Sequence, residues 1–317
     1  MRKETFLCVD LGGTKILVGE LTKTGEILDR RTFISDISSQ KAALKSIKEI
    51  IHFYLKNVVI QEKIVALSLD VVGRVDSERK VWFEIDPGNA EGIELGKELE
   101  QEFRLPVFVN NDVSSAAIAE KHLGIGRLTS DFVYLNVGTG IAGRTVSGGR
   151  LIAGGHFNAG EVGHTVVDMD FNKVCACGRY GCVESFASGS GLSSEVHRLR
   201  ERFPTVMEIT PGKKISGERI LAAYQKQDTL AEVVIDHATR GIAELIMNLV
   251  RVSDPEAVVV GGGLMSNTLF YQRVLEKLNQ KTMRFVKYGV SQTSIDPALI
   301  ALKGCAVHAN AKMKEGK

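Results

Sequence analysis

The sequence predicts an α/β protein that contains two domains of related fold. Apolar runs of strand length alternate with segments of helical periodicity along the whole chain. The same opening, an apolar strand followed by a turn with glycine and threonine, occurs at residues 6–14 and again at residues 132–140. The length of 317 residues also exceeds the usual size of a single domain.

The composition indicates a soluble globular protein without a surface for nucleic acid. The chain is 44% hydrophobic and 25% charged, and its formal net charge is only +2. The first apolar run reaches Asp10 too soon for a signal peptide, and no stretch approaches the roughly 18 apolar residues of a membrane span. We therefore expect a cytoplasmic protein that binds neither nucleic acid nor a membrane.

Strands in the first half are marked by apolar runs between turns, and helices by apolar residues at helical spacing. The expected strands are 5–11, 15–21, 26–33, 64–69 and 107–109. The expected helices are 39–56, 95–103 and 112–122.

The second half shows the same alternation. The expected strands are 132–137, short strands up to about 167, 257–260 and 284–287. The expected helices are 182–202, 216–250, 267–280 and a C-terminal helix from 297 to about 312, with Pro297 in its first turn.

The repeated opening has two interpretations. It can be chance similarity between two β-hairpins, or it can mark two pseudo-repeated domains that each begin with strand, turn and strand. The offset between residues 6–14 and 132–140 is too long for a solenoid repeat. We favour two repeated domains, because both hairpins open a series of alternating strands and helices.

The first glycine turn, DLGGTK at residues 10–15, is a candidate phosphate site. Two glycines after a strand permit positive φ and a close approach of the backbone to a ligand. Their amides, with Thr14 and Lys15, can surround an anion, and Asp10 can hold Mg²⁺ through water. The motif lacks the spacing of a Walker P-loop, and a plain hairpin turn is the alternative.

Two later glycine turns can act on the same ligand. Residues 138–143, GTGIAG, repeat the chemistry of the first turn in the second domain. Residues 261–263, GGG, follow a buried strand and can lie against a nucleoside, since ligands of α/β sheets bind at the carboxyl ends of strands. A tight connection between strand and helix is the alternative for these three glycines.

Asp112 follows Asn110 and Asn111 between an expected strand and an expected helix. An aspartate at this place most often caps the helix. A carboxylate at a strand end can also accept a proton from a substrate hydroxyl, so both roles remain open.

The cysteines give the strongest local signal. Cys175, Cys177 and Cys182 lie within eight residues, and His164 precedes them by eleven. Three thiolates and an imidazole are the ligand set of a closed, structural zinc site. Buried structural cysteines and a redox pair are the alternatives, whereas an odd total of five cysteines argues against a disulfide framework.

Two carboxylates lie beside this cluster in the sequence. Glu161 precedes His164 by three residues, and Glu184 follows Cys182 by two. A zinc-bound His164 would have its second ring nitrogen oriented as a donor. We therefore expect Glu161, His164 and Glu184 to bind hydroxyl groups of a sugar-like ligand.

These motifs together resemble the ROK family of bacterial sugar kinases, within the actin-like ATPase superfamily, over nearly the whole chain. The resemblance is carried by the DLGGTK turn, residues 111–112, GTG at 138–140, AGEVGH at 159–164, the cysteine segment 175–184 and residues 254–263.

The resemblance implies two actin-like (ribonuclease H-like) domains with a cleft between them. The first would span 1–115, with a C-terminal helix at about 303–317 packed back on it, and the second 116–302 with the zinc loop. It also implies a homo-oligomer, a dimer or tetramer.

The implied activity is ATP-dependent phosphorylation of a hexose 6-hydroxyl with Mg²⁺, and Asp112 would be the general base. The sugar would be held by Asn89, Asn111, Asp112, Glu161, His164 and Glu184. Mg-ATP would be held by Asp10, Gly12, Gly13, Thr14, Lys15, Gly138, Thr139, Gly140, Gly261, Gly262 and Gly263. Structural zinc would be held by His164, Cys175, Cys177 and Cys182.

D-Glucose is the expected sugar, because the context of Glu161 resembles that of glucose and N-acetylhexosamine kinases. N-acetylmannosamine or N-acetylglucosamine is the alternative substrate, and a sugar-responsive regulator without its DNA-binding domain is the alternative class. The sequence departs from the family pattern at Ala142 and Arg144, where glycines are usual. The sugar-binding loop leaves two candidates, Asp86 and Asn89.

Overall fold

The computed structural model describes residues 3–86 and 88–315, so the termini of the expected domains at 1 and 317 lie outside the described residues. Two compact units result. Unit 1 contains the described residues up to Arg127, together with Ala153–Ala159 and those from Ala298 onward. Unit 2 contains Leu128–Ile152 and Gly160–Pro297. The boundary expected after residue 115 falls inside a helix of unit 1.

Unit 1 is built on a mixed sheet with the strand order β3-β2-β1-β4-β7. The strands are β1 (Glu4–Leu11), β2 (Lys15–Thr22), β3 (Ile27–Ile34), β4 (Lys63–Val71) and β7 (Val107–Asn111), with a separate hairpin of β5 (Arg74–Asp76) and β6 (Val81–Glu84). The first three strands are antiparallel neighbours, and β4 and β7 continue the sheet in parallel. The carboxyl ends of β1, β4 and β7 therefore share one edge.

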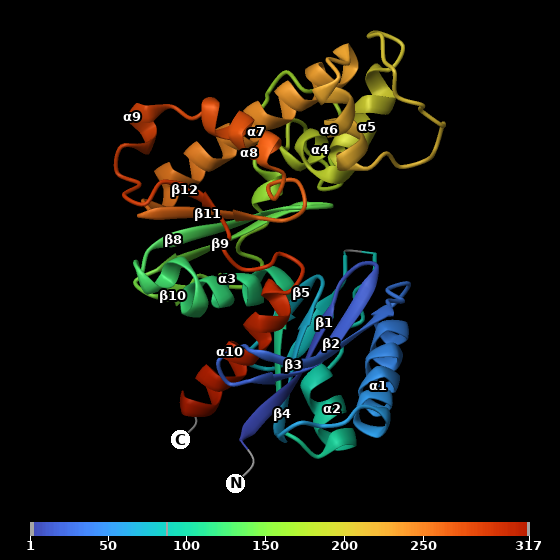
Figure 1. Ribbon diagram of the computed structural model, residues 1–317, viewed down its shortest axis with the longest axis vertical. Helices are drawn as coiled ribbons and strands as arrows, with labels where there is room; N and C mark the ends of the chain where they lie inside the picture. Colours follow the sequence, from blue (N-terminus) through green and yellow to red (C-terminus); the bar gives the residue numbers. More distant parts are fainter. Residues whose placement is uncertain (1–2, 87, 316–317) are drawn as a thin grey trace. The chain divides into compact units, whose positions relative to one another are not determined.

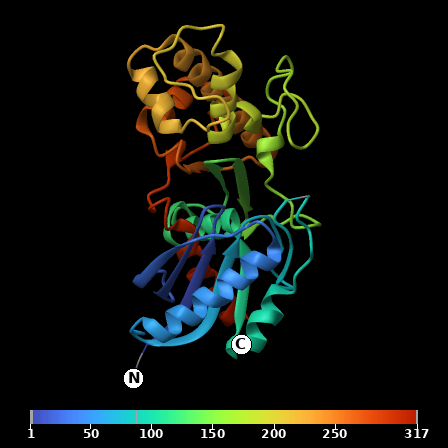
Figure 2. The same cartoon turned by 90° about the vertical axis from the view of Figure 1, so that its right-hand side faces the viewer.

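Helices cover both faces of this sheet (Figures 1 and 2). They are α1 (Gln40–Asn57), α2 (Leu95–Phe103), α3 (Asp112–Leu123) and α10 (Ile300–Glu315), with a 3-10 turn at Ile125–Arg127. Because side chains of a strand alternate, Leu7 and Val9 face the core under α1 and α2, whereas Phe6 and Cys8 face α10. Cys305 of α10 lies in that second core, so Cys8 and Cys305 are both core thiols.

Unit 2 repeats the sheet arrangement of unit 1. Its strands are β8 (Phe132–Val137), β9 (Ile141–Ser147), β10 (Arg150–Leu151), β11 (Ala257–Gly261) and β12 (Val290–Gln292), in the order β10-β9-β8-β11-β12. The hairpin of β8 and β9 corresponds to that of β1 and β2, and β11 pairs in parallel with β8 as β4 does with β1. The repeated opening is confirmed as a repeat of domain topology.

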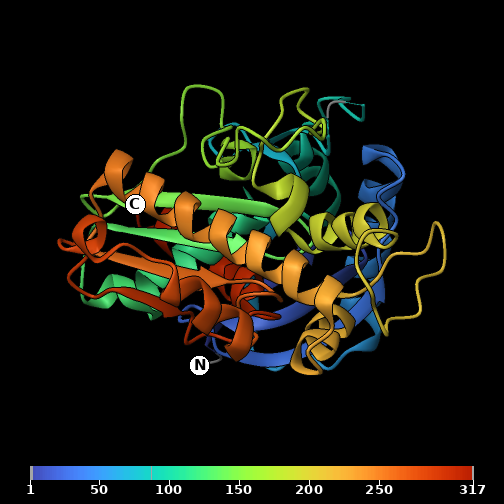
Figure 3. The same ribbon diagram turned by 90° about the horizontal axis from the view of Figure 1, so that it is seen from above.

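A large hydrophobic core packs against this second sheet. The helices are α4 (Glu184–Ala187), α5 (Gly189–Leu199), α6 (Gly217–Gln225), α7 (Thr229–Ser253), α8 (Thr268–Glu276) and α9 (Gln280–Met283), with a 3-10 turn at Val162–His164. The long helix α7 runs along the unit (Figure 3), and Ala238, Ile242 and Leu245 share its core with Val258 and Val260 of β11.

Several expected element boundaries were wrong for local reasons. The helix expected at 182–202 is divided at Ser188, whose hydroxyl caps α5 by accepting from the Gly191 amide. Asp228 caps α7 in the same way, which divides the helix expected at 216–250. Residues 284–287 form turns instead of a strand, and the C-terminal helix begins at Ile300 rather than at Pro297.

None of the helices within residues 3–86 and 88–315 is long and apolar enough to cross a bilayer.

Candidate active site

The first glycine turn lies at the carboxyl edge of the unit 1 sheet. Asp10 precedes it on β1, Gly13 and Thr14 are exposed, and Lys15 begins β2. The Gly12 amide donates to the Lys15 carbonyl at 3.0 Å, which closes the turn. The turn does not use the positive φ that glycine permits, since neither Gly12 nor Gly13 has it. The backbone conformation therefore does not require glycine at these two positions. The absence of side chains instead leaves room for a ligand beside the turn.

Asp70 lies beside Asp10 in register on β4. It is fully buried, and its Oδ2 accepts from the Cys305 thiol at 2.7 Å. Burial, and then the negative charge of Asp10, raise the pKa of Asp70 well above its ordinary value. Burial raises the pKa of Asp10 as well. This pair was not expected from the sequence, although Asp70 is a lone carboxylate in the apolar run of β4.

Asn111, not Asp112, caps α3. The Asn111 side chain accepts from the Val113 amide at 3.0 Å and the Ser114 amide at 3.2 Å, and its Nδ2 donates to the Gly73 carbonyl at 2.8 Å. Asp112 is the first helical residue, and its Oδ1 accepts from the Val113 amide at 2.9 Å. The carboxylate of Asp112 thus stands at the positive end of α3 and at the carboxyl edge of the sheet.

Asp86 and Asn89 have different contacts in their loop. Asp86 Oδ1 accepts from the Gly88 amide at 2.8 Å and so stabilises the turn itself. The Asn89 amide group joins this loop to the start of α1, because its Oδ1 accepts from the Gln40 amide at 3.2 Å and its Nδ2 donates to the Ser38 carbonyl at 3.4 Å.

The second glycine turn connects β8 and β9 in unit 2. The Gly138 amide donates to the Gly140 carbonyl at 2.9 Å. Two amides at the start of α5 support the turn from outside. Gly189 donates to the Gly138 carbonyl at 2.8 Å, and Ser190 donates to the Thr139 carbonyl at 3.2 Å.

The third glycine turn lies next to the second within unit 2. Gly261 ends β11, and Gly263 is exposed. Gly262 has φ +87°, and a Cβ there would lie 2.5 Å from the Val137 carbonyl oxygen. The Leu264 amide donates to that same carbonyl at 3.1 Å. Only glycine combines this positive φ with so close an approach to Val137. The third turn is thus bonded to the strand that leads into the second turn, which agrees with the expectation that residues 138–140 and 261–263 serve one ligand.

Arg144 packs against the backbone of its own unit. Its guanidinium Nη1 donates to the Gly143 carbonyl at 2.8 Å, and the residue is 6% exposed. Gly160, with φ +104°, passes so close to this guanidinium that a Cβ would overlap it. The bulk of Arg144 is therefore accommodated by a glycine in the segment before Glu161.

The four expected metal ligands do come together in unit 2. Their ligand atoms, from His164, Cys175, Cys177 and Cys182, all lie within 4.8 Å of one another. Cys177 Sγ is 3.6 Å from Cys182 Sγ, and Cys175 Sγ is 3.3 Å from His164 Nδ1. Ligands of a tetrahedral zinc ion lie about 3.5–3.8 Å apart, so these residues fit a zinc site. All three cysteines are free, with no disulfide between them.

The thiols of this cluster differ in acidity. Burial raises the pKa of Cys175, but the nearby polar groups of Ser185 and Cys177 outweigh it and lower the pKa to about 7. Burial and the neighbouring thiols raise the pKa of Cys182 to about 12. A dication would remove this difference, since all coordinating thiols are thiolates.

Glu161 and Glu184 occupy different environments around the cluster. Glu161 is exposed and precedes the 3-10 turn Val162–His164. Glu184 begins α4, and its Oε2 accepts from the Ile141 amide at 2.7 Å. His164 turns Nδ1 toward the thiols, so its Nε2 faces away from them. Nε2 can then donate to a ligand while Nδ1 binds the metal, as the zinc hypothesis requires.

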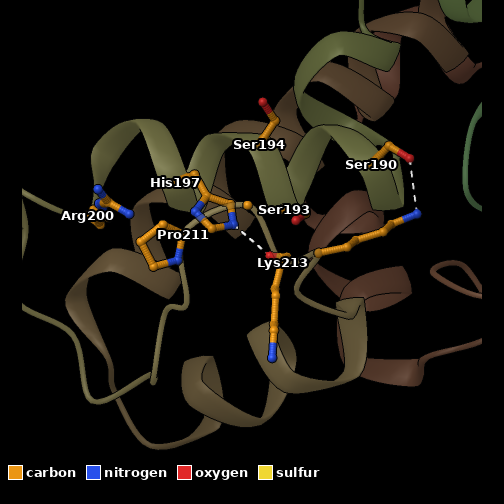
Figure 4. A pocket seen from close by; sticks show the side chains of 9 residues that line it. Ser190, Ser193, Ser194, His197, Arg200, Pro211 and Lys213 are labelled. Atoms are coloured by element: carbon orange, nitrogen blue, oxygen red, sulfur yellow. Dashed lines mark hydrogen bonds between the residues drawn. The ribbon is translucent and has the colours of Figure 1, made fainter.

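Two cavities adjoin α5. One, of about 490 Å³, lies between the second glycine turn and the metal-ligand loop, and its lining includes Thr139, Gly140, Lys173, Cys175, Glu184 and Ser190. The other, of about 440 Å³ (Figure 4), is lined by Ser190, Ser193, Ser194, His197, Arg200, Pro211, Gly212, Lys213 and Lys214. The second cavity was not expected from the sequence, in which only the adjacent Lys213 and Lys214 indicated a polar site.

The loop beside this second cavity is held to α5. His197 Nε2 lies 2.9 Å from the Lys213 carbonyl, and Lys214 Nζ donates to the Ser190 hydroxyl at 3.2 Å (Figure 4). Ser190 and Ser194 line both cavities, so the two are neighbours along one face of α5.

Comparison with known proteins identifies the class to which this fold and site belong. The model of the ROK family matches residues 6–300. An N-acetylmannosamine kinase from Shigella flexneri is 32% identical over 263 residues, which cover 82% of this chain and 83% of that protein. The chain therefore belongs to the ROK family.

Solved structures agree with this assignment. The ROK hexokinase from Thermus thermophilus has a TM-score of 0.80 and 26% identity, over 98% of this chain and 100% of that one. A ROK-family glucokinase from Streptomyces griseus, in complex with glucose and AMPPNP, has a TM-score of 0.75 and 25% identity, over 95% and 98%. The expected α/β class with two actin-like units is thus confirmed.

Proposed function

We propose that this chain is an ATP-dependent sugar kinase that phosphorylates the 6-hydroxyl of a hexose, D-glucose foremost. The observation that carries the proposal is the repeated hairpin, which provides a partly exposed glycine turn at residues 12–14 of unit 1 and at 138–140 of unit 2. Phosphoryl transfer depends mainly on positioning and charge stabilisation, for which such turns are suited. Membership of the ROK family supports the same activity.

The nucleotide would be bound by all three glycine turns. Asp10 would hold Mg²⁺, which neutralises phosphate charge when bound. The phosphates would be contacted by Gly12, Gly13, Thr14, Lys15, Gly138, Thr139 and Gly140, and the nucleoside by Gly261, Gly262 and Gly263. Lys15 adds a positive charge at the start of β2.

Asp112 would act as the general base. Its carboxylate accepts the proton of the sugar 6-hydroxyl while that oxygen attacks the γ-phosphorus. The bond between the γ-phosphorus and the bridging oxygen breaks, which yields the sugar 6-phosphate and ADP. Asn89, Asn111, Glu161, His164 and Glu184 would bind the other hydroxyls of the sugar.

The metal-ligand cluster would hold structural zinc through His164, Cys175, Cys177 and Cys182. When bound, zinc would cross-link the loop and fix the orientation of the His164 ring. His164 Nε2 would then donate to a sugar hydroxyl.

The identity of the sugar has one alternative with support. N-acetylmannosamine would replace glucose if the site resembles that of the Shigella flexneri relative, an N-acetylmannosamine kinase. N-acetylglucosamine is the other N-acetylated candidate. We further propose a cytoplasmic role in carbohydrate metabolism, with glycolysis as the pathway for glucose, and a homodimer or homotetramer.

A coupled assay of ADP release tests the function. Purified protein is supplied with Mg-ATP and, in turn, glucose, mannose, fructose, N-acetylmannosamine and N-acetylglucosamine. We expect turnover with glucose at the highest kcat/KM. Turnover confined to an N-acetylated sugar would establish the alternative, and no turnover on any hexose would exclude the kinase proposal.

Asp112→Asn is expected to lower kcat by about 10²–10⁴-fold, because the amide cannot accept the proton. An amide oxygen can still accept from the Val113 amide, so the start of α3 should remain intact. Sugar binding, measured by calorimetry, should change little. Retained turnover would remove Asp112 from the role of base.

A further inference from the structure

The carboxylate of Glu184 lies where three segments of unit 2 meet. Glu184 Oε2 accepts from the backbone amide of Ile141 at 2.7 Å, directly after the second glycine turn. Ile141 is only 2% exposed, so its amide depends on this acceptor. This contact belongs to the turn between β8 and β9.

Two glycines make room for the Glu184 side chain. A Cβ on Gly140 would lie 2.8 Å from Glu184 Oε2. A Cβ on Gly163 would lie 3.1 Å from the same oxygen and 2.4 Å from the Ile141 carbonyl oxygen. The carboxylate is thus enclosed between the second glycine turn and the 3-10 turn that carries His164.

The residues that follow Glu184 support the same turn. The amides of Gly189 and Ser190 donate to the carbonyls of Gly138 and Thr139, whereas Glu184 accepts from the amide at the other end of the turn. Glu184 is therefore the side-chain part of a set of contacts that fixes all the peptide groups of residues 138–141.

We infer that Glu184 is a positioning residue for the nucleotide: it fixes the glycine turn at 138–140 by accepting the Ile141 amide, in addition to any contact with the sugar. This inference rests on the proposed function, in which that turn binds nucleotide phosphates. With the acceptor gone, the Gly140–Ile141 peptide keeps the hydrogen bond from the Gly138 amide to the Gly140 carbonyl but loses the one at the Ile141 amide. The turn then holds its amides and the Thr139 hydroxyl less rigidly in one arrangement.

Two variants separate the accepted hydrogen bond from the negative charge. Glu184→Gln removes the charge but keeps an acceptor oxygen at the same distance along the side chain. Glu184→Asp keeps the charge but withdraws it by one methylene group, beyond reach of the Ile141 amide. Glu201→Ala is the control, since it removes a carboxylate of unit 2 that is 84% exposed.

The measurement is the Kd of MgADP by calorimetry in the absence of sugar. We expect Glu184→Asp to weaken binding tenfold or more, Glu184→Gln to remain within about twofold, and Glu201→Ala to match the unaltered protein. Thermal unfolding of the free variants is recorded alongside, and the two Glu184 variants should differ less in stability than in affinity.

The opposite pattern, or equal affinity in all variants, would overturn the inference. If unaltered protein binds MgADP and Glu184→Asp binds it equally well, Glu184 does not position the turn. If the unaltered protein binds no nucleotide, the proposed kinase function itself fails. The two failures are therefore distinguishable.

Discussion

Asn111 and Asp112 show that adjacent residues at a helix start can have separate tasks. An aspartate before a helix is most often a cap, yet Asn111 satisfies the first amides of α3 and also bonds the Gly73 carbonyl. Asp112 is therefore not required as the cap. The Asp112 carboxylate can therefore act on a substrate while Asn111 keeps the start of α3 capped.

Asp70 provides a test of how a buried carboxyl pair affects stability. Burial and the charge of Asp10 raise its pKa in the folded state. The unfolded chain therefore releases this proton at a lower pH than the folded chain does, and the free energy of unfolding falls as the pH rises between the two pKa values. Asp70→Asn keeps an acceptor for Cys305 and removes the ionisable group. We expect the variant to raise the free energy of unfolding by about 1–2 kcal/mol at pH 8 and to have a smaller effect at pH 5.

Urea unfolding at the two pH values measures this difference. Asp76→Asn is the contrast, because the Asp76 carboxylate is buried but accepts from the amides of Glu78 and Arg79. That variant should lose stability at pH 8. A loss for Asp70→Asn at pH 8 would contradict the pairing of Asp70 with Asp10.

At the scale of elements, α10 joins the core of unit 1 through a close crossing with α3. A Cβ on Gly304 of α10 would lie 1.9 Å from the Ser115 carbonyl oxygen of α3. Gly304→Ala gains helix propensity of about 1 kcal/mol but forces the helices apart. We expect a net loss of about 2 kcal/mol in the free energy of unfolding, measured in urea.

Gly155→Ala is the matched control, since Gly155 has no heavy atom within 4 Å of an added Cβ and no positive φ. It should change stability by no more than about 0.5 kcal/mol. Equal stability of Gly304→Ala and the unaltered protein would mean that α10 can shift away from α3 without loss.

The loop that holds the cysteines has little apolar packing, and Cys177 is exposed. Zinc would therefore supply much of its order. We expect purified protein to contain about one zinc per chain, and Cys177→Ser to lose most of it and become more sensitive to protease in the loop. Elemental analysis and limited proteolysis measure both effects. Cys8→Ala, in the core under α10, should keep the metal, and zinc-free unaltered protein would refute the assignment.

Elements with a strong pattern could be predicted from the sequence, whereas those set by tertiary contacts could not. The hairpin β1–β2 follows from alternation and a glycine turn. The strand expected at 284–287 was wrong because an apolar run alone does not specify pairing; β12 pairs with β11 through Val290–Gln292 instead. The break at Ser188 depends on the Ser188 hydroxyl acting as a cap, which helical periodicity does not reveal.

The candidate site shows the same division. The clustering of His164, Cys175, Cys177 and Cys182 could be predicted, because their residue types and spacing are typical of a zinc site. The contact between Glu184 and Ile141 could not, because it joins residues 43 apart through folding of the whole unit. Asp70 was missed for the same reason, since its partner Asp10 lies on a neighbouring strand.

For the whole molecule, the repeat explains more than the composition does. A net charge of +2 only argues against functions such as nucleic-acid binding. The two sheets have corresponding strand orders, so each unit has an equivalent edge at the carboxyl ends of its parallel strands. Each edge carries a hairpin turn with glycine and threonine. The expectation of related turns in both units therefore follows from topology, not from the individual motifs.

Acid stability should depend on one buried histidine of α10. Burial, and then the positive charge of Lys312, lower the pKa of His308 to about 4, although the charges of Glu78 and Glu315 oppose the shift. The unfolded chain, with a histidine pKa near 6.5, therefore binds a proton that the folded chain does not. Between these values stability falls as the pH falls, by about 2 kcal/mol from pH 7.5 to pH 5 for this residue alone.

His308→Leu removes this dependence. The loss of stability between pH 7.5 and pH 5 should be smaller in the variant by about 2 kcal/mol, whatever its stability at pH 7.5. Because the carboxylates are unchanged, their contribution cancels in the comparison. His156→Ala, which removes an exposed imidazole, should leave the pH dependence as it is. An identical pH profile for His308→Leu and the unaltered protein would mean that His308 gains a proton in the folded state as easily as in the unfolded one.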